Sequence, residues 1–378
     1  MVNYGFLSTY PPTQCGLATF CAALLRHLAN PMTGSRCGVV QVADGAYQTV
    51  RRDPAAALVT VRSHSASRAA EVLNRYDVLI VQHEYGIYGG LDGEDVLNVL
   101  DRVDVPVITV LHTVLALPTP HQRLVLQRVI DASDAVVVLS QAAATTLIAG
   151  YLIEEGRVSV IPHGAPALGR QRPGSARSSD RPTILTWGLI GPGKGIEWAI
   201  GALGHLRDVQ PAVRYLVAGQ THPKVLADQG EAYRNGLRRQ ARAQGVLDLV
   251  EFDPTYREVG SLMHVVRQAD VVLLPYDSSQ QVTSGVLIEA VAAQRPVVAT
   301  AFPHARELLG GGAGIVVPHR DPQAIAHAIR RVLTEPGLAE AMTARCAALA
   351  PALSWTAVAN SYRALAKSLL AAPAAVAS

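Results

Sequence analysis

A glycine-rich junction near the middle of the chain carries the strongest chemical signal. An apolar run ends at Trp187, four glycines follow within residues 188–195, and a segment with helical spacing begins near Lys194. Glycines let main-chain amides approach phosphate oxygens, and a lysine adds a positive charge against them. The junction therefore predicts a diphosphate-binding site, the alternative being a merely structural turn.

The same junction nearly matches the P-loop pattern G-x-x-x-x-G-K-[ST] through Gly188, Gly193 and Lys194. Gly195 stands where a P-loop needs a hydroxyl group to bind Mg²⁺. The match also falls in mid-chain, after what reads as a complete first domain. Both features disfavour a P-loop NTPase.

A second junction spans residues 274–290, where small polar residues lead from a buried strand into a helix. Glu289 lies one turn into that helix, among apolar side chains. A carboxylate in such surroundings is costly unless it meets hydrogen-bond donors, and the hydroxyls of a ribose would supply them. We therefore predict that Glu289 binds a nucleotide ribose; the alternative is an exposed helix carboxylate.

Histidines follow predicted strands at several points. His83 and Glu84 end one strand and are predicted to contact an acceptor, with a structural loop as the alternative. His112 ends another, and its chemistry alone fits either a catalytic or a buried structural histidine. His163 lies next to the predicted linker and is predicted to be part of a hinge. His222 follows a strand that ends near the predicted nucleotide.

The elements that must position these residues alternate along the whole chain. Short β-branched runs alternate with longer segments at helical spacing, which is typical of parallel sheets covered on both faces. Residues 169–181, rich in Gly, Ser and Arg, read as an exposed linker. The fold class is therefore α/β, with two Rossmann-like doubly wound domains facing a cleft. The domains are 1–168 on the acceptor side and 182–352 on the donor side, and 353–378 form a helix that crosses back to the first.

The individual elements follow the same reading. Strands are predicted at 37–42, 58–62, 77–82, 106–111, 135–139, 158–162, 183–187, 214–218, 250–252, 271–275, 296–299 and 314–317. Helices are predicted at 17–28, 66–75, 121–131, 196–207, 231–244, 286–293, 322–333 and 355–370.

Composition excludes several classes of protein. The chain has 378 residues, 49% of them hydrophobic, and a formal net charge of only +3. That charge gives no reason to expect a nucleic-acid partner. The start of the chain lacks the features of a signal peptide, and no apolar run reaches the roughly 20 residues of a membrane span. We expect a cytoplasmic protein and leave peripheral contact with the inner membrane face open; its oligomeric state is not predicted.

These junctions resemble those of glycosyltransferase family 4, retaining enzymes of the GT-B fold, and among them a bacterial mannosyltransferase-like branch. That family carries a glycine turn followed by Lys-Gly, and then Glu-x7-Glu-Ala-x-Ala-x-Gly-x-Pro-Val. Here the second block reads Gln281-x7-Glu289-Ala290-Val-Ala292-Ala-Gln294-Arg-Pro296-Val297. The resemblance extends to residues 9–20, 82–89, 219–223 and 353–355.

The resemblance implies a role for each matching residue. Lys194 would bind the donor diphosphate, Glu289 the ribose, and the loop around Gly16 would close over the diphosphate from the opposite domain. His112 and Gln281 would act beside the transferred sugar. The remaining implied donor contacts are Gly191, Thr283, Ser284, Gly285 and Val286.

Two departures from the family pattern change the expected chemistry. Gln281 replaces the first glutamate of the paired motif, so an amide would hydrogen-bond the donor sugar. Leu189 replaces the arginine that usually follows the first glycine, which leaves Lys194 with fewer cationic helpers. No Asp-x-Asp triplet occurs, so we expect no metal or other cofactor, and the leaving diphosphate would be neutralised by Lys194 and backbone amides.

The predicted function is carbohydrate biosynthesis: transfer of a hexose, with mannose favoured over glucose, from a nucleotide diphosphate sugar to a hydroxyl of a carbohydrate or glycolipid. The resemblance implies retention of configuration. Two alternatives stay open at this point, a disaccharide phosphorylase on the same fold and a catalytically decayed sugar- or partner-binding protein.

Overall fold

The chain forms two α/β units, as a computed structural model shows for residues 1–29, 34–43, 46–49, 65–167, 181–278 and 283–371. The first unit comprises Met1–Gly164 and Ser354–Ser378, and the second comprises Ala165–Leu353. Each unit has its own sheet and its own buried core. The predicted α/β fold class is confirmed.

The sheet of the first unit has seven strands in the order β3-β2-β1-β4-β5-β6-β7. All neighbours run parallel except β2 and β3. The order reverses direction between β1 and β4, which makes their carboxyl ends the expected place for a ligand. The strands are β1 (Tyr4–Ser8), β2 (Cys37–Ala43), β3 (Ala46–Thr49), β4 (Val78–His83), β5 (Val107–Leu111), β6 (Ala135–Val138) and β7 (Val158–Val160).

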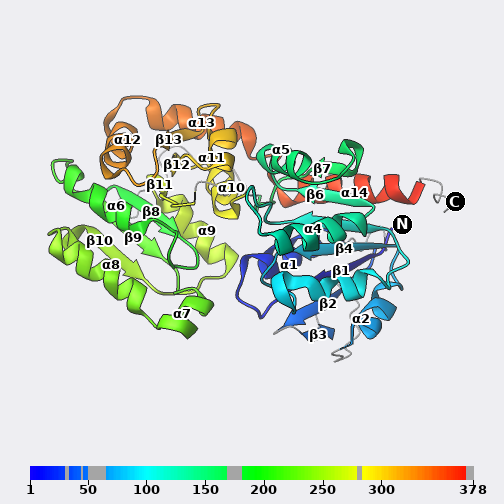
Figure 1. Ribbon diagram of the computed structural model, residues 1–378. Coiled ribbons are helices and arrows are strands. Elements are labelled where there is room, and N and C mark those ends of the chain that lie inside the picture. The colour runs from blue at the N-terminus through cyan, green and yellow to red at the C-terminus, as the bar shows by residue number, and fades with distance from the viewer. Residues whose placement is uncertain (30–33, 44–45, 50–64, 168–180, 279–282, 372–378) are drawn as a thin grey trace. The chain divides into compact units, whose positions relative to one another are not determined.

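Helices from both ends of the chain pack together in the first unit, where the red helix α14 joins the blue-to-green elements (Figure 1). Phe20 of α1 and Trp355 of α14 share one buried cluster. Arg363 also donates a hydrogen bond to the His27 carbonyl oxygen. The helical segments are α1 (Gly16–Leu28), α2 (Ala66–Leu73), η1 (Leu91–Val96), α3 (Leu97–Leu100), α4 (Pro120–Asp131), α5 (Gln141–Gly150), η2 (Glu155–Arg157) and α14 (Trp355–Ala371).

The second unit has a fully parallel sheet of six strands in the order β10-β9-β8-β11-β12-β13. Here the order reverses between β8 and β11. Both strands are fully buried, and their residues are apolar apart from Thr183 and Thr186 of β8, as expected of strands covered on both faces. The strands are β8 (Thr183–Trp187), β9 (Arg214–Ala218), β10 (Val250–Asp253), β11 (Val271–Leu274), β12 (Val297–Thr300) and β13 (Gly314–Val317).

Except for the helix Pro223–Gln229, which has no buried residue, the helices of the second unit bury apolar side chains in two clusters against this sheet. They are α6 (Ile196–Leu203), η3 (Gly204–Leu206), α7 (Pro223–Gln229), α8 (Ala232–Ala243), η4 (Leu247–Leu249), α9 (Val259–Gln268), α10 (Gly285–Ala292), α11 (Pro303–Leu309), α12 (Pro322–Thr334) and α13 (Leu338–Leu349). The α-helix α6 is shorter than the predicted helix 196–207, because the chain tightens after Leu203 into the 3-10 segment η3. The predicted strand 58–62 and most of the predicted linker lie outside the described residues.

Candidate functional site

The two junctions singled out in the sequence leave neighbouring strands at the reversal point of the second sheet. β8 pairs with β11, and the loops that start at Gly188 and Pro275 follow their carboxyl ends. In open α/β sheets this is where ligands bind, since the loops diverge there and helix N-termini face the opening. Both junctions therefore belong to one site.

Direct contacts join the two loops. The Asp277 amide donates a 3.0 Å hydrogen bond to the Gly193 carbonyl oxygen. Gly195 has a φ of +66°, and a Cβ atom there would lie 1.8 Å from the Pro275 carbonyl oxygen. Only glycine combines the left-handed conformation with so close an approach. The turn before α6 is thus held against the second junction by its backbone.

Gly195→Ala is expected to lower the melting temperature by roughly 8 °C or more, because strain and a backbone clash add together. Gly193→Ala is the matched control, since Gly193 also has a positive φ, +86°, but its Cβ would meet nothing within 4 Å. That control should cost only about 3 °C. Thermal melting of both purified variants checks the difference, and equal shifts would contradict the close packing of the turn.

Lys194 lies on an aromatic platform supplied by the second junction. Its Nζ atom is 4.7 Å from the centre of the Tyr276 ring, and that ring stacks on Phe302 with 5.3 Å between centroids. Tyr276 is buried, whereas Lys194 is half-buried. A cation over an aromatic face is attracted to it and loses little mobility on binding an anion. The ammonium group is therefore positioned at the mouth of the glycine turn.

Glu289 projects from α10 toward the end of β8. Trp187 Nε1 donates a 3.2 Å hydrogen bond to Glu289 Oε2. Burial raises the pKa of the Glu289 carboxyl to about 7, although the tryptophan bond opposes this shift. One indole donor does not satisfy a carboxylate with two oxygens, so the group is ready to accept hydrogen bonds from a ligand.

The first turn of α10 is organised by internal hydrogen bonds. Ser284 Oγ accepts from the Leu287 amide at 3.2 Å, and the Ser284 amide donates to Nδ1 of the buried His304 at 2.9 Å. Burial lowers the pKa of His304 to about 4, which keeps the ring neutral and able to accept. The Ser284 amide and hydroxyl oxygen thus hold the helix start, and the hydroxyl hydrogen stays available for the predicted donor contact. Thr283, Gly285 and Val286 lie beside it at the same edge, whereas Gln281 lies outside the described residues.

A third loop, after β9, joins the glycine turn from the other side. The Ile190 amide donates to the Gln220 carbonyl oxygen, and the His222 amide donates to the Ile190 carbonyl oxygen, both at 2.8 Å. Position 219 requires glycine, because a Cβ atom there would lie 2.0 Å from the Gly188 carbonyl oxygen. Gly191, a predicted donor contact, is buried between these loops.

In the first unit, His112 follows β5 and is held on two sides. Its Nε2 atom is 2.5 Å from Gln82 Oε1, and its ring packs edge-on against Phe20 at 4.9 Å between centroids. Burial is the main cause that lowers its pKa to about 3, and the nearby His163 and His83 lower it further. The ring is neutral at physiological pH, so His112 can exchange hydrogen bonds but carries no charge.

The two predicted acceptor residues differ in their surroundings. Glu84 is half-buried and accepts hydrogen bonds from Thr113 Oγ1 at 2.5 Å and from the Tyr85 amide at 3.0 Å. His83 is 0% exposed, and neither ring nitrogen has a hydrogen-bond partner among the described residues. Burial lowers its pKa to about 4. The predicted acceptor contact of His83 is not supported, because β4 continues through this residue and keeps its ring in the interior.

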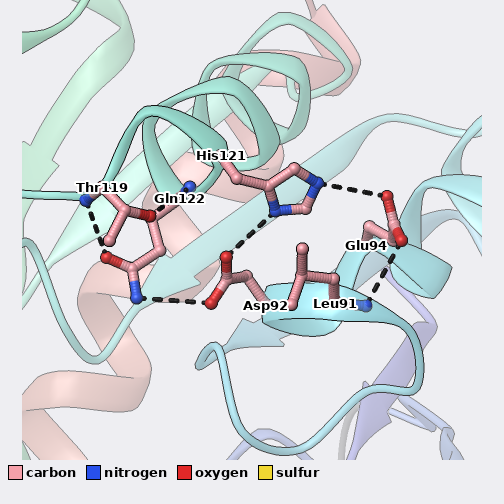
Figure 2. A network of polar contacts seen from close by, with 6 residues as sticks. All are labelled: Leu91, Asp92, Glu94, Thr119, His121 and Gln122. Atoms are coloured by element: carbon pink, nitrogen blue, oxygen red, sulfur yellow. Dashed lines mark hydrogen bonds and ion pairs between the residues drawn. The ribbon is translucent and has the colours of Figure 1, made fainter.

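Other loops at the same edge of the first sheet are cross-linked (Figure 2). His121 of α4 contacts Asp92 at 3.0 Å and Glu94 at 3.5 Å, so the segment after β4 is tied to the helix after β5. Thr119 and Gln122 form a capping box at the start of α4. Gly16, the predicted lid residue, begins α1, and a Cβ there would meet nothing within 4 Å.

Trp187, Tyr276 and His304 are site residues that the sequence analysis missed. Each supports a predicted residue and is buried. Trp187 offers a faint signal, since a polar indole at the end of a buried strand needs a partner. Nothing in the sequence pairs Tyr276 with Lys194 or His304 with Ser284, because those pairs form only when neighbouring strands bring their loops together.

Comparisons with known proteins agree with this fold. Residues 181–335 match the family described as Glycosyl transferases group 1, and residues 16–167 match Glycosyltransferase Family 4. The two matches cover most of both units. The fold and the family matches define a glycosyltransferase of the GT-B fold. The chain belongs to glycosyltransferase family 4.

The chain is also similar to curated glycosyltransferases. The D-inositol 3-phosphate glycosyltransferase of Kineococcus radiotolerans is 29% identical over 358 residues, which cover 85% of this chain and 79% of the relative. That of Geodermatophilus obscurus is 31% identical over 303 residues, which cover 72% of this chain and 65% of the relative.

Solved structures share the fold at low identity. Sucrose-phosphate synthase from Thermosynechococcus elongatus has a TM-score of 0.77 and 18% identity, with 99% of this chain and 100% of that one covered. Anabaena HepE in complex with UDP-glucose has a TM-score of 0.72 and 17% identity, with 97% and 100% covered. Within the described part of the chain, no helix combines the length and apolarity needed to span a bilayer.

Proposed function

We propose that this glycosyltransferase moves a hexose from a nucleotide diphosphate sugar to a hydroxyl of a carbohydrate or glycolipid. The observation that carries the proposal is the union of the two junctions in the second unit. Lys194 and Glu289, 95 positions apart in the chain, are both anchored by residues at the carboxyl ends of β8 and β11. A cation and a carboxylate at one such edge match the two polar ends of a nucleoside diphosphate.

The donor is bound through three complementary interactions. Main-chain groups of the glycine turn and the ammonium of Lys194 neutralise the diphosphate, which makes a metal ion unnecessary. The ribose hydroxyls donate to Glu289 and complete its partial solvation by Trp187. Thr283, which precedes the N-cap of α10, and the first helical residues Gly285 and Val286 lie beside the transferred sugar. The departing diphosphate is stabilised by the same groups as its charge develops.

In the first unit, His112 acts on the transferred sugar. Its pKa of about 3 keeps it neutral, and its bond to Gln82 fixes the ring. A neutral, fixed imidazole hydrogen-bonds a sugar hydroxyl without repelling the positive charge that develops on the sugar ring. The leaving phosphate then takes the acceptor proton on the face it departs from, so configuration is retained.

Two observations bear on which hexose is transferred, and they favour different sugars. The motif pattern favours mannose, whereas HepE, a structural neighbour, was solved with UDP-glucose. The curated relatives named D-inositol 3-phosphate glycosyltransferases lend support to a polyhydroxylated acceptor. We propose mannose first and glucose second, with a polyhydroxylated acceptor.

A panel of nucleoside diphosphates tests the donor site by thermal shift. A ligand that binds only the folded state raises its melting temperature. We expect GDP or UDP to raise the midpoint, the matching monophosphate to raise it less, and the corresponding GDP-mannose, GDP-glucose or UDP-glucose to be consumed only when an acceptor polyol is added. Inorganic phosphate with a disaccharide should give no sugar phosphate. Phosphorolysis without any nucleotide shift would instead identify a phosphorylase.

A further inference from the structure

The loop that follows β9 contributes a side chain to the edge of the glycine turn. Ile190 bridges Thr221 in parallel fashion, and the His222 amide donates to the Ile190 carbonyl oxygen. A Cβ atom on Gly191 would lie 3.7 Å from the Cβ of His222. His222 is therefore adjacent to Gly191 of the glycine turn, and the His222 side chain is half-buried.

The backbone fixes which ring nitrogen of His222 carries the proton. The Lys224 amide donates a 3.2 Å hydrogen bond to His222 Nδ1. Burial lowers the pKa of His222, and the charges of Lys224 and Lys194 lower it further. A neutral imidazole that accepts at Nδ1 must hold its hydrogen on Nε2. Nε2–H is thus a prepared donor on a side chain close enough to Lys194 to respond to its charge.

The loop that carries His222 is itself braced from within. Thr221 Oγ1 donates to Glu231 Oε2 at 2.6 Å, and the buried Arg234 donates through Nη2 to the Gly219 carbonyl oxygen at 2.7 Å. Arg234 also forms an ion pair with Glu231 at 3.2 Å. Bracing of this kind keeps a ligand-binding group in place before the ligand arrives.

A diphosphate needs more than Lys194 supplies. It carries at least two negative charges, whereas Lys194 supplies one positive charge. We propose that His222 donates from Nε2 to a phosphate oxygen of the donor and so acts as the second side-chain ligand of the diphosphate. The proposal rests on the nucleoside-diphosphate function assigned above to the same edge of the sheet.

Two substitutions separate the donor role from the capping role. His222→Asn keeps a side-chain oxygen that accepts from the Lys224 amide but removes the donor at the Nε2 position. His222→Gln reaches the Nε2 position with an amide donor. Isothermal titration with uridine or guanosine, the monophosphate and the diphosphate measures how much affinity each phosphate adds in each variant.

We expect His222→Asn to weaken diphosphate binding about tenfold, as loss of one hydrogen bond to a charged group does, and to leave nucleoside affinity within about twofold. His222→Gln should recover part of the loss. Unchanged diphosphate affinity in His222→Asn, or an equal loss for nucleoside and diphosphate, overturns the proposal. Glu289→Ala separates the two ideas: if it weakens nucleoside binding while both His222 variants bind normally, the nucleotide site stands and only the histidine ligand is wrong.

Discussion

Lys194→Ala is expected to lower the rate of sugar transfer by roughly two to three orders of magnitude, which is the usual effect of removing one preorganised group that stabilises charge in a transition state. The leaving diphosphate gains charge as the glycosidic bond breaks, and the ammonium over Tyr276 is placed against that charge before the reaction starts. Turnover under saturating donor gives the measurement, since the loss should appear in kcat as well as in donor affinity.

The fold should survive this substitution. Lys194 is half-buried, and the loss of its contact with Tyr276 removes about 1 kcal/mol or less. Lys367→Ala on α14 is the matched control, because that lysine is exposed and belongs to the first unit. It should leave both turnover and melting temperature unchanged. A Lys194→Ala enzyme with normal turnover would show that the diphosphate does not leave from this turn.

The sequence identifies the framework of the site well because the framework is local. The strands predicted at 183–187, 214–218 and 314–317 coincide with β8, β9 and β13, since each is a short apolar run between helical segments. The spacing of the glycines then locates the turn, because few residues other than glycine tolerate its positive φ angles and close backbone contacts.

The supporting residues depend on pairing between distant segments and leave no such pattern. The resemblance implies Ser284 as a donor contact, but it does not indicate that the Ser284 amide is paired with His304, twenty residues later. The burial of His83 is missed for a related reason: β4 extends one residue beyond the predicted strand, and the His83 side chain lies in the interior. Alternation along β4 cannot reveal this, because all six of its residues are buried.

Binding of a ribonucleoside diphosphate is expected to weaken as the pH falls from 8 to 6, through the ionisation of Glu289. Burial raises the pKa of this carboxyl from 4.5 to about 7, so the free protein holds a proton there over part of that range. Ribose hydroxyls donate to the carboxylate and favour its ionised form, so binding releases the proton. We expect about a tenfold loss of affinity, measured by titration calorimetry in buffers of different ionisation enthalpy.

The 2′,3′-dideoxy analogue is the control, since it has the same diphosphate ionisation but no hydroxyls for Glu289 to accept from. Its affinity should lack the extra pH dependence.

Stability of the free protein provides an independent check of the sign. A carboxyl whose folded pKa is raised stabilises the fold below the unfolded pKa of 4.5, and that contribution is lost as the pH rises through about 7. Glu289→Gln should therefore gain stability over the wild type as the pH rises from 5 to 8, by about 2 kcal/mol once partial exposure is allowed for. A constant difference between the two proteins across that range would mean that Glu289 is already solvated as a carboxylate, and the ribose would then have no reason to bind it.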